Sequence, residues 1–151
     1  MEQIAMATIT TQPAVVGFSW PTAVDLSNRD VQQRLTPAAT RGLLKIAKAW
    51  DLSSEGARLL LGGMSTGSFY NLTKGAVRKL DQDQLTRVSL VIGIFKALNI
   101  LYSTRLADKW ISLPNTNPMF GGETPLHYMQ QGGIPAMVRV RQLLDARRGG
   151  K

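Results

Sequence analysis

Residues 113–151 read LPNTNPMFGGETPLHYMQQGGIPAMVRVRQLLDARRGGK, and glycine and proline divide this stretch into short segments. Pro114 predicts the end of a preceding helix, because proline lacks an amide donor and disfavours helical dihedral angles in the residue before it. A loop should follow over residues 115–122. Thr124 is a suitable N-cap for a short helix over residues 125–131, which begins with proline and is stopped by glycine.

The last part of this stretch predicts an amphipathic helix that begins at Pro135. Its apolar residues recur at three- and four-residue steps, as in a helix docked on its own domain; they are Met137, Val140, Leu143 and Leu144. Phe120, in the preceding loop, should pack back onto the core. Residues 147–151 contain no apolar side chain, and their two glycines predict a loose tail.

The order of the residue types in this stretch is informative. The sequence follows P-N-x-x-x-x-F-x-G-x-x-P-L, then M-x-x-G-G, then V-R-x-x-L-D-x-x-R-G-G. With this pattern, the last third of the chain resembles the C-terminal toxin-binding domain of the Xre/MbcA/ParS antitoxin family. The positions that match are Pro114, Asn115, Phe120, Gly121, Pro125, Gly132, Gly133, Arg141, Leu144, Asp145, Arg147, Gly149 and Gly150.

The resemblance implies a type II antitoxin that binds a RES-domain toxin, an enzyme that degrades NAD, and holds it inactive. Members of the family commonly form homodimers, and many repress their own operon by binding operator DNA. Most of the matched positions shape the domain, so the surface of the final helix and the tail are the candidates for direct toxin contact. These candidates are Arg141, Leu144, Asp145, Arg147, Arg148, Gly149, Gly150 and Lys151.

Composition limits the class of protein. The chain has 151 residues, of which 44% are apolar, enough for one compact domain or two very small ones. It has no cysteine and a single histidine, His127, which excludes disulfides, thiolate metal sites and histidine-rich metal sites. This composition fits a reducing cytoplasm, and we expect a cytoplasmic protein without a cofactor or a metal.

The net charge of +8 is unevenly distributed. Residues 37–80 hold seven basic and two acidic residues, a net charge of +5, whereas residues 1–36 hold two basic and three acidic residues, a net charge of −1. A basic segment favours a polyanionic partner, most simply nucleic acid. The alternative is a basic surface that keeps the protein soluble and binds no ligand.

Residues 1–35 show no sustained helical period, and we expect them to form a partly disordered N-terminal arm. Phe18 and Trp20 should order this arm where their side chains become buried. The uncharged stretch 3–24 is too polar to span a bilayer and has no basic start. We therefore expect neither a membrane segment nor a signal peptide.

The segment 36–80 has the spacing of a helix-turn-helix. Thr36, followed by proline, predicts the start of a first helix, and Ser53 or Ser54 predicts the cap of a second one. Two glycines then predict a tight turn. Ser65 should cap a third helix, the recognition helix, which a later glycine stops.

The predicted recognition helix, residues 65–74, offers small hydroxyl groups and an asparagine that can pair with adenine. Three cations in this helix and just after it can neutralise phosphates. The candidate DNA contacts are Ser65, Thr66, Ser68, Tyr70, Asn71, Lys74, Arg78 and Lys79, whereas Phe69 and Leu72 should lie in the core. Only one residue of the helix is charged, so the alternative is a structural remnant that does not contact DNA.

Residues 82–103 predict one long helix, opened by Asp81 and Asp83, since acidic groups suit the positive end of a helix. Its apolar residues leave hardly any polar face, and a helix that is apolar all round is buried all round. Part of this surface must meet either the C-terminal helices or a second copy of the chain, so we expect a homodimer. A further helix should follow over residues 105–110.

The sequence contains no recognisable catalytic constellation. His127 is alone, and we interpret it as a residue on a helix surface. Residues 62–65 superficially resemble a phosphate-binding loop, but they lack the lysine that follows it in such loops, so we interpret them as a turn. We therefore expect neither enzymatic activity nor a small-molecule substrate.

Together these patterns predict an all-α protein with three parts. They are an arm over residues 1–35, a helix-turn-helix domain over residues 36–80, and a small helical toxin-binding and dimerisation domain over residues 81–151. The function implied by the resemblance is that of an antitoxin that also represses its own operon. One alternative is a stand-alone helix-turn-helix transcription regulator whose C-terminal domain only dimerises. Another, implied by one branch of the family, is an adaptor in chromosome partition or polar localisation.

Overall fold

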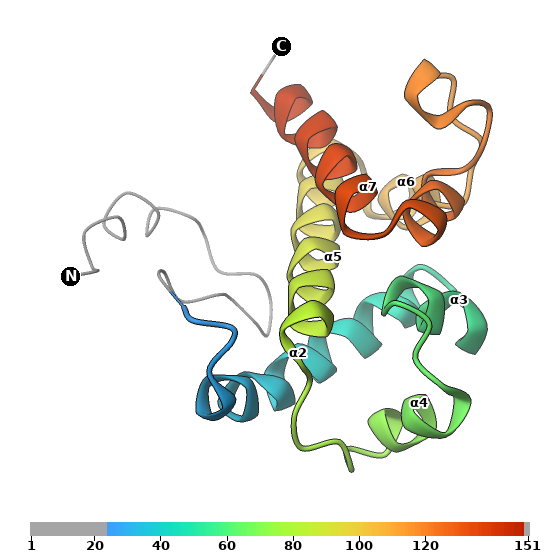
Figure 1. Ribbon diagram of the computed structural model, residues 1–151. Coiled ribbons are helices and arrows are strands. Elements are labelled where there is room, and N and C mark those ends of the chain that lie inside the picture. Colours follow the sequence, from blue (N-terminus) through green and yellow to red (C-terminus); the bar gives the residue numbers. More distant parts are fainter. Residues whose placement is uncertain (1–23, 150–151) are drawn as a thin grey trace.

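The computed structural model describes residues 24–149, and within them every regular element is a helix, which confirms the all-α prediction for this part of the chain (Figure 1). The predicted arm anchors Phe18 and Trp20 and the last two predicted toxin contacts, Gly150 and Lys151, lie outside the described residues. The elements are α2 (Arg29–Ala49), α3 (Ser54–Leu60), α4 (Thr66–Thr73), α5 (Gln82–Leu101), α6 (Thr104–Trp110), the 3₁₀ turn η1 (Pro118–Phe120) and α7 (Pro125–Arg148).

Helix α2 begins earlier than its sequence predicts. Asn28 caps it by accepting hydrogen bonds from the next amides, so the predicted start at Thr36 is wrong, and the predicted boundary between arm and domain falls inside this helix. Thr36 is instead buried within α2, where its hydroxyl donates to the carbonyl of Gln32 (2.6 Å) and accepts from the amide of Leu80 (2.8 Å). Its role is to tie the segment before α5 to α2.

Two short helices follow, joined by a tight turn. Ser53 caps α3 and Ser65 caps α4, each by accepting a hydrogen bond from a backbone amide three residues later (3.0 and 3.1 Å), as predicted. The turn needs positive φ at Gly62 (87°) and Gly63 (85°), which glycine adopts without steric cost. The Arg58 carbonyl accepts hydrogen bonds from the amides that leave the turn, so it fixes the path from α3 into α4.

Helix α5 forms the centre of the molecule and packs against α2, α6 and α7 (Figure 1). Asp81 and Gln84 form a capping box at its start, since the side chain of each residue accepts a hydrogen bond from the backbone amide of the other. One hydrophobic core runs from α2 through α5 to α7. Among the described residues, α5 is the helix that is long and apolar enough to cross a membrane, a test that the core helix of a soluble protein also passes.

The connection between α6 and α7 closes the C-terminal end of the core. Phe120 is only 2% exposed and lies edge-on between Trp110 and Tyr128, with ring centroids 6.2 and 5.2 Å away, so its predicted return to the core is confirmed. The amide of Leu126 donates to the carbonyl of Ile111 (2.9 Å) and fastens the start of α7 to the end of α6.

Candidate functional site

Helix α7, the predicted site of partner contact, is bent at Gly133. This residue has φ 66° and ψ −150°, a combination that is essentially open to glycine alone. The bend separates a first arm, residues 125–132, from a second arm, residues 134–148, close to the predicted break. Thr124 caps the first arm as predicted, and the Gln130 side chain donates to the carbonyl of Gly56 (3.0 Å), which binds this arm to α3.

Gly133→Ala is expected to lower the free energy of unfolding by about 1–3 kcal/mol, because a Cβ atom is incompatible with this backbone conformation. Thermal unfolding followed by circular dichroism should show a melting temperature that is lower by about 2–4 °C for each kcal/mol of stability lost. Gly67→Ala is a matched control, since this helical position in α4 has open space around it and alanine favours helix. If both variants shift the melting temperature in the same direction, the bend does not depend on glycine.

The second arm lies along α5, and the two run in the same direction (Figure 1). The predicted apolar stripe is confirmed, since Met137, Val140 and Leu144 are fully buried. Arg141 crosses α5 at Gly93, where a Cβ atom would overlap its guanidinium. Gly93 therefore provides the space that lets this arginine lie between the helices.

An ionic network covers this part of α7. The Arg141 Nε donates to both carboxylate oxygens of Asp145 (3.2 and 3.0 Å), and Arg148 is 3.5 Å from the same carboxylate. Burial, and then the charges of Arg148 and Arg141, lower the pKa of Lys96 on α5. We call Lys96, Arg141, Asp145 and Arg148 the cationic cluster. Arg141 and Arg148 share one acid, Asp145, so the electrostatic potential around them favours an acidic partner.

The predicted loose tail is wrong for its first two residues. Arg147 and Arg148 form the last turn of α7, which Gly149 ends, and the Arg147 guanidinium donates to the Tyr102 hydroxyl at the end of α5 (3.1 Å). The sequence missed this contact because its partner is 45 residues away in the chain. The two arginines are thereby held on the surface by a regular helix.

The predicted toxin contacts therefore differ in what they offer a partner. Leu144 is fully buried and holds α7 on the core, so its side chain presents no surface, in contrast to its predicted place in the interface. Arg141 is half-buried, while Asp145, Arg148 and Gly149 are exposed. The structure brings the charged members together at the C-terminal end of α7.

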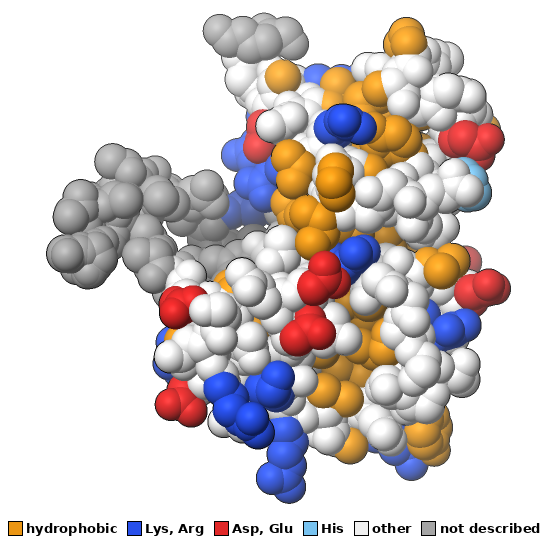
Figure 2. Space-filling model, in the orientation of Figure 1, with side chains coloured by type: hydrophobic (Ala, Val, Ile, Leu, Met, Phe, Trp, Pro, Cys, Tyr) orange, Lys and Arg blue, Asp and Glu red, His pale blue; other side chains and the backbone are white. Residues whose placement is uncertain are grey.

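The sequence predicted uncovered apolar surface on the long helix but not which side chains of this region stay exposed. Ile100 at the end of α5 is 54% exposed, Leu106 on α6 is 43% exposed and Leu113 is 47% exposed. Figure 2 shows hydrophobic side chains gathered on the half of the molecule that carries α7. The sequence signal for Ile100 was weak, because a helix with hardly any polar face does not reveal which of its residues stay uncovered.

The second candidate surface is on α4 and the segment after it. The predicted DNA contacts Ser65, Thr66, Ser68, Tyr70, Asn71, Lys74 and Arg78 are exposed, and the predicted core residues Phe69 and Leu72 are buried. The Lys74 ammonium lies over the Tyr70 ring, 4.8 Å from its centroid. Lys79 differs from the others, because it is half-buried and its ammonium donates to the Gln32 side chain (3.1 Å).

The described residues contain no group of three His, Cys, Asp or Glu side chains that could hold a metal ion. His127 is half-exposed, and its Nε2 is 3.7 Å from a Glu123 oxygen, one turn away along the chain. This position agrees with its interpretation as a residue on the surface of a helix.

Comparisons with known proteins address the C-terminal part of the chain directly. Residues 97–150 match the model of a family described as the antitoxin Xre/MbcA/ParS C-terminal toxin-binding domain. This range spans the end of α5, α6, η1 and the whole of α7. The chain is also 39% identical, over 115 residues, to the uncharacterized protein y4oB of Sinorhizobium fredii (strain NBRC 101917 / NGR234), which covers 76% of this chain and 87% of that protein. No solved structure is significantly similar to the chain.

Proposed function

This chain belongs to the Xre/MbcA/ParS antitoxin family, and we propose that it neutralises a RES-domain toxin, an enzyme that degrades NAD. The observation that carries the proposal is the overlap between the toxin-binding family match at residues 97–150 and the surface that holds the cationic cluster. We further propose that the protein acts in the cytoplasm, by binding, and performs no catalysis itself.

The surface suits the entrance of a site that binds NAD. NAD carries two phosphates and must pass through the entrance to reach such a site. A partner that covers the entrance therefore keeps NAD out and inhibits the enzyme. Arg147 and Arg148 can pair with acidic side chains at the rim of the entrance, where charge-assisted hydrogen bonds are strong. Ile100 and Leu106 add apolar surface of the kind that the centre of an interface buries.

The proposal is tested by expressing the chain together with the protein encoded beside its gene. An antitoxin should co-purify with that protein and restore growth when the protein is induced. The alternative function, a stand-alone transcription regulator, requires only operator binding and dimerisation. It is favoured if the neighbouring protein is harmless and does not bind the chain.

We propose a second activity, repression of the operon through α3, the glycine turn and α4. Two short helices with a tight turn have the arrangement of a helix-turn-helix, and α4 would enter the major groove. The support lies in the side chains on α4, where hydroxyls, Asn71 and Lys74 are exposed while Phe69 and Leu72 hold the helix on the core.

Replacing Lys74, Arg78 and Lys79 together by alanine is expected to weaken binding to every DNA sequence alike, because a protein with fewer phosphate contacts releases fewer counterions. The slope of log K against log salt should become shallower by about 3. Asn71→Ala should instead relax the preference at one base pair. Binding to the promoter is measured by fluorescence anisotropy at several salt concentrations.

Lys79→Ala alone is the informative control, because this lysine also bonds to Gln32. If its phosphate contact matters, the single variant shifts the slope by about 1. If its role is only structural, the slope is unchanged and stability falls. Wild-type binding by the triple variant would show that this segment does not contact DNA.

We also propose a homodimer. Leu113 exposes apolar surface after α6, and α5 is so apolar that any part of it left open by α2, α6 and α7 would favour association between chains. Light scattering at micromolar concentration should give about twice the chain mass of 16.5 kDa. A constant mass of one chain under dilute and concentrated conditions would rule the dimer out.

A further inference from the structure

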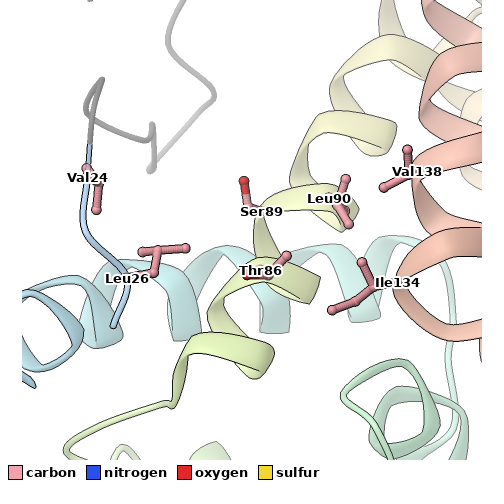
Figure 3. Close-up of a pocket in the computed structure, with 7 residues that line it drawn as sticks. All are labelled: Val24, Leu26, Thr86, Ser89, Leu90, Ile134 and Val138. Atoms are coloured by element: carbon pink, nitrogen blue, oxygen red, sulfur yellow. The ribbon is translucent and has the colours of Figure 1, made fainter. Parts of the chain in front are cut away.

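A shallow apolar groove crosses α5 (Figure 3). Its volume is about 340 Å³. Val24 and Leu26 lie on one side and Ile134 and Val138 on the other, while Thr86, Ser89 and Leu90 of α5 lie between them. None of these seven side chains carries a charge, and the groove touches α7 directly after its bend at Gly133.

We propose that this groove holds Phe18 and Trp20 of the same chain. The described part of the chain starts at Val24, which is itself a wall of the groove, so the segment before it leaves from the edge of the site. Four residues span about 13 Å when extended, which lets Trp20 reach across α5. The occupant therefore needs no long connection and no second molecule.

The chemistry of the segment matches that of the groove. Residues 1–23 contain one charged side chain, Glu2, at the far end, and Phe18 and Trp20 are the two aromatic residues nearest to the groove. With its volume of about 340 Å³, the groove has room for bulky aromatic side chains, which contribute more apolar contact than other kinds of residue. The hydroxyl of Thr86 or Ser89 provides the acceptor that a buried indole N–H requires.

Docking of these aromatics would join three elements that are far apart in the sequence. The segment before α2 would be fastened to α5 and to the second arm of α7, beside the glycine that permits the bend. It would also cover apolar surface that otherwise favours association between molecules. The docking involves this chain alone and requires neither a toxin nor DNA.

Tryptophan fluorescence of the full chain tests the proposal. The other two tryptophans, Trp50 and Trp110, are 2% and 8% exposed, so the difference between wild type and Trp20→Phe isolates the signal of Trp20. We expect this signal to be shifted to the blue and several-fold less sensitive to acrylamide than a free indole. Val138→Asp, which places a charge in the groove, should remove that protection. If Trp20 is equally quenched in wild type and in Val138→Asp, the proposal is wrong.

A crosslink gives a second test that leaves the apolar side chains of the groove unchanged. The chain has no cysteine, so Ser19→Cys with Ser89→Cys creates one defined pair. Mild oxidation should yield an intramolecular disulfide, seen as a faster band on a non-reducing gel. Ser19→Cys with Ser54→Cys, at an exposed position of α3, is the matched control and should not form the disulfide. An equal yield from both pairs, or a crosslinked dimer in place of the monomer, overturns the assignment of the groove to this chain's own segment.

Discussion

Leu144→Ala is expected to lower the free energy of unfolding by about 2–5 kcal/mol. Leu144 is fully buried in the last turns of α7, where it faces the core together with Met137 and Val140. Alanine would leave a cavity that the packed helices fill only in part. Urea unfolding should show a lower midpoint with an unchanged slope.

The control for this prediction is Leu106→Ala, the same chemical change on α6. Leu106 is 43% exposed and leaves no enclosed cavity, so its effect should stay below about 1 kcal/mol. If the two variants are equally stable, the placement of α7 on the core is wrong. Leu144→Ala also distinguishes a structural role of this residue from direct toxin contact. Because the side chain is buried, the variant should lose toxin binding only to the extent that it unfolds.

Replacing Arg147 and Arg148 together by alanine is expected to weaken toxin binding by roughly 100-fold, or about 2.7 kcal/mol, because arginine is enriched among the few interface residues whose loss costs about 2 kcal/mol or more. Both lie in the last turn of α7, where the helix holds them on the surface. The fold should survive, since these two side chains are joined to another helix mainly by the hydrogen bond from Arg147 to Tyr102. Affinity is measured by calorimetry or surface plasmon resonance with purified toxin.

Two further variants locate the effect. Arg139→Ala removes an exposed arginine from the same arm of α7, where its guanidinium lies 3.4 Å from the Tyr128 hydroxyl, and should bind toxin normally. Deletion of residues 149–151 keeps both arginines but removes the tail. Normal binding by the double alanine variant, together with weak binding by the deletion, would place the inhibitory contact in the tail and not on the helix.

Local signals predicted much of the fold. Ser53, Ser65 and Thr124 each cap a helix because the side-chain oxygen accepts a hydrogen bond from the backbone amide three residues later. Glycine and proline likewise predicted the break in α7. Features of this kind can be recognised in a sequence because cause and effect are neighbours in the chain.

The errors arose where distant contacts decide the outcome. Thr36 followed by proline has the form of an N-cap, yet its hydroxyl accepts a hydrogen bond from the amide of Leu80, which lies 44 residues later. Arg147 was assigned to a loose tail because its hydrogen-bond partner, Tyr102, belongs to another helix. The stripe of apolar residues predicted that Leu144 faces the core, and its second assignment, to the toxin interface, conflicts with that burial.

The site was less predictable than the fold for the same reason. The sequence identified the charged residues at the end of α7, but the cationic cluster depends on Lys96 of α5 and on the space above Gly93. Neither follows from a pattern along one helix. On α4, by contrast, the alternation of buried and exposed residues is a property of the helix itself, and the predicted faces agree with the observed burial.

The NAD content of cells that express the neighbouring toxin tests the central claim most directly. Toxin alone should deplete NAD and stop growth, whereas toxin with the full chain should leave NAD at the level of uninduced cells. At equal expression, the variant with alanine at residues 147 and 148 should protect less. Unchanged NAD depletion in the presence of the full chain would contradict the proposal that this protein neutralises an NAD-degrading toxin.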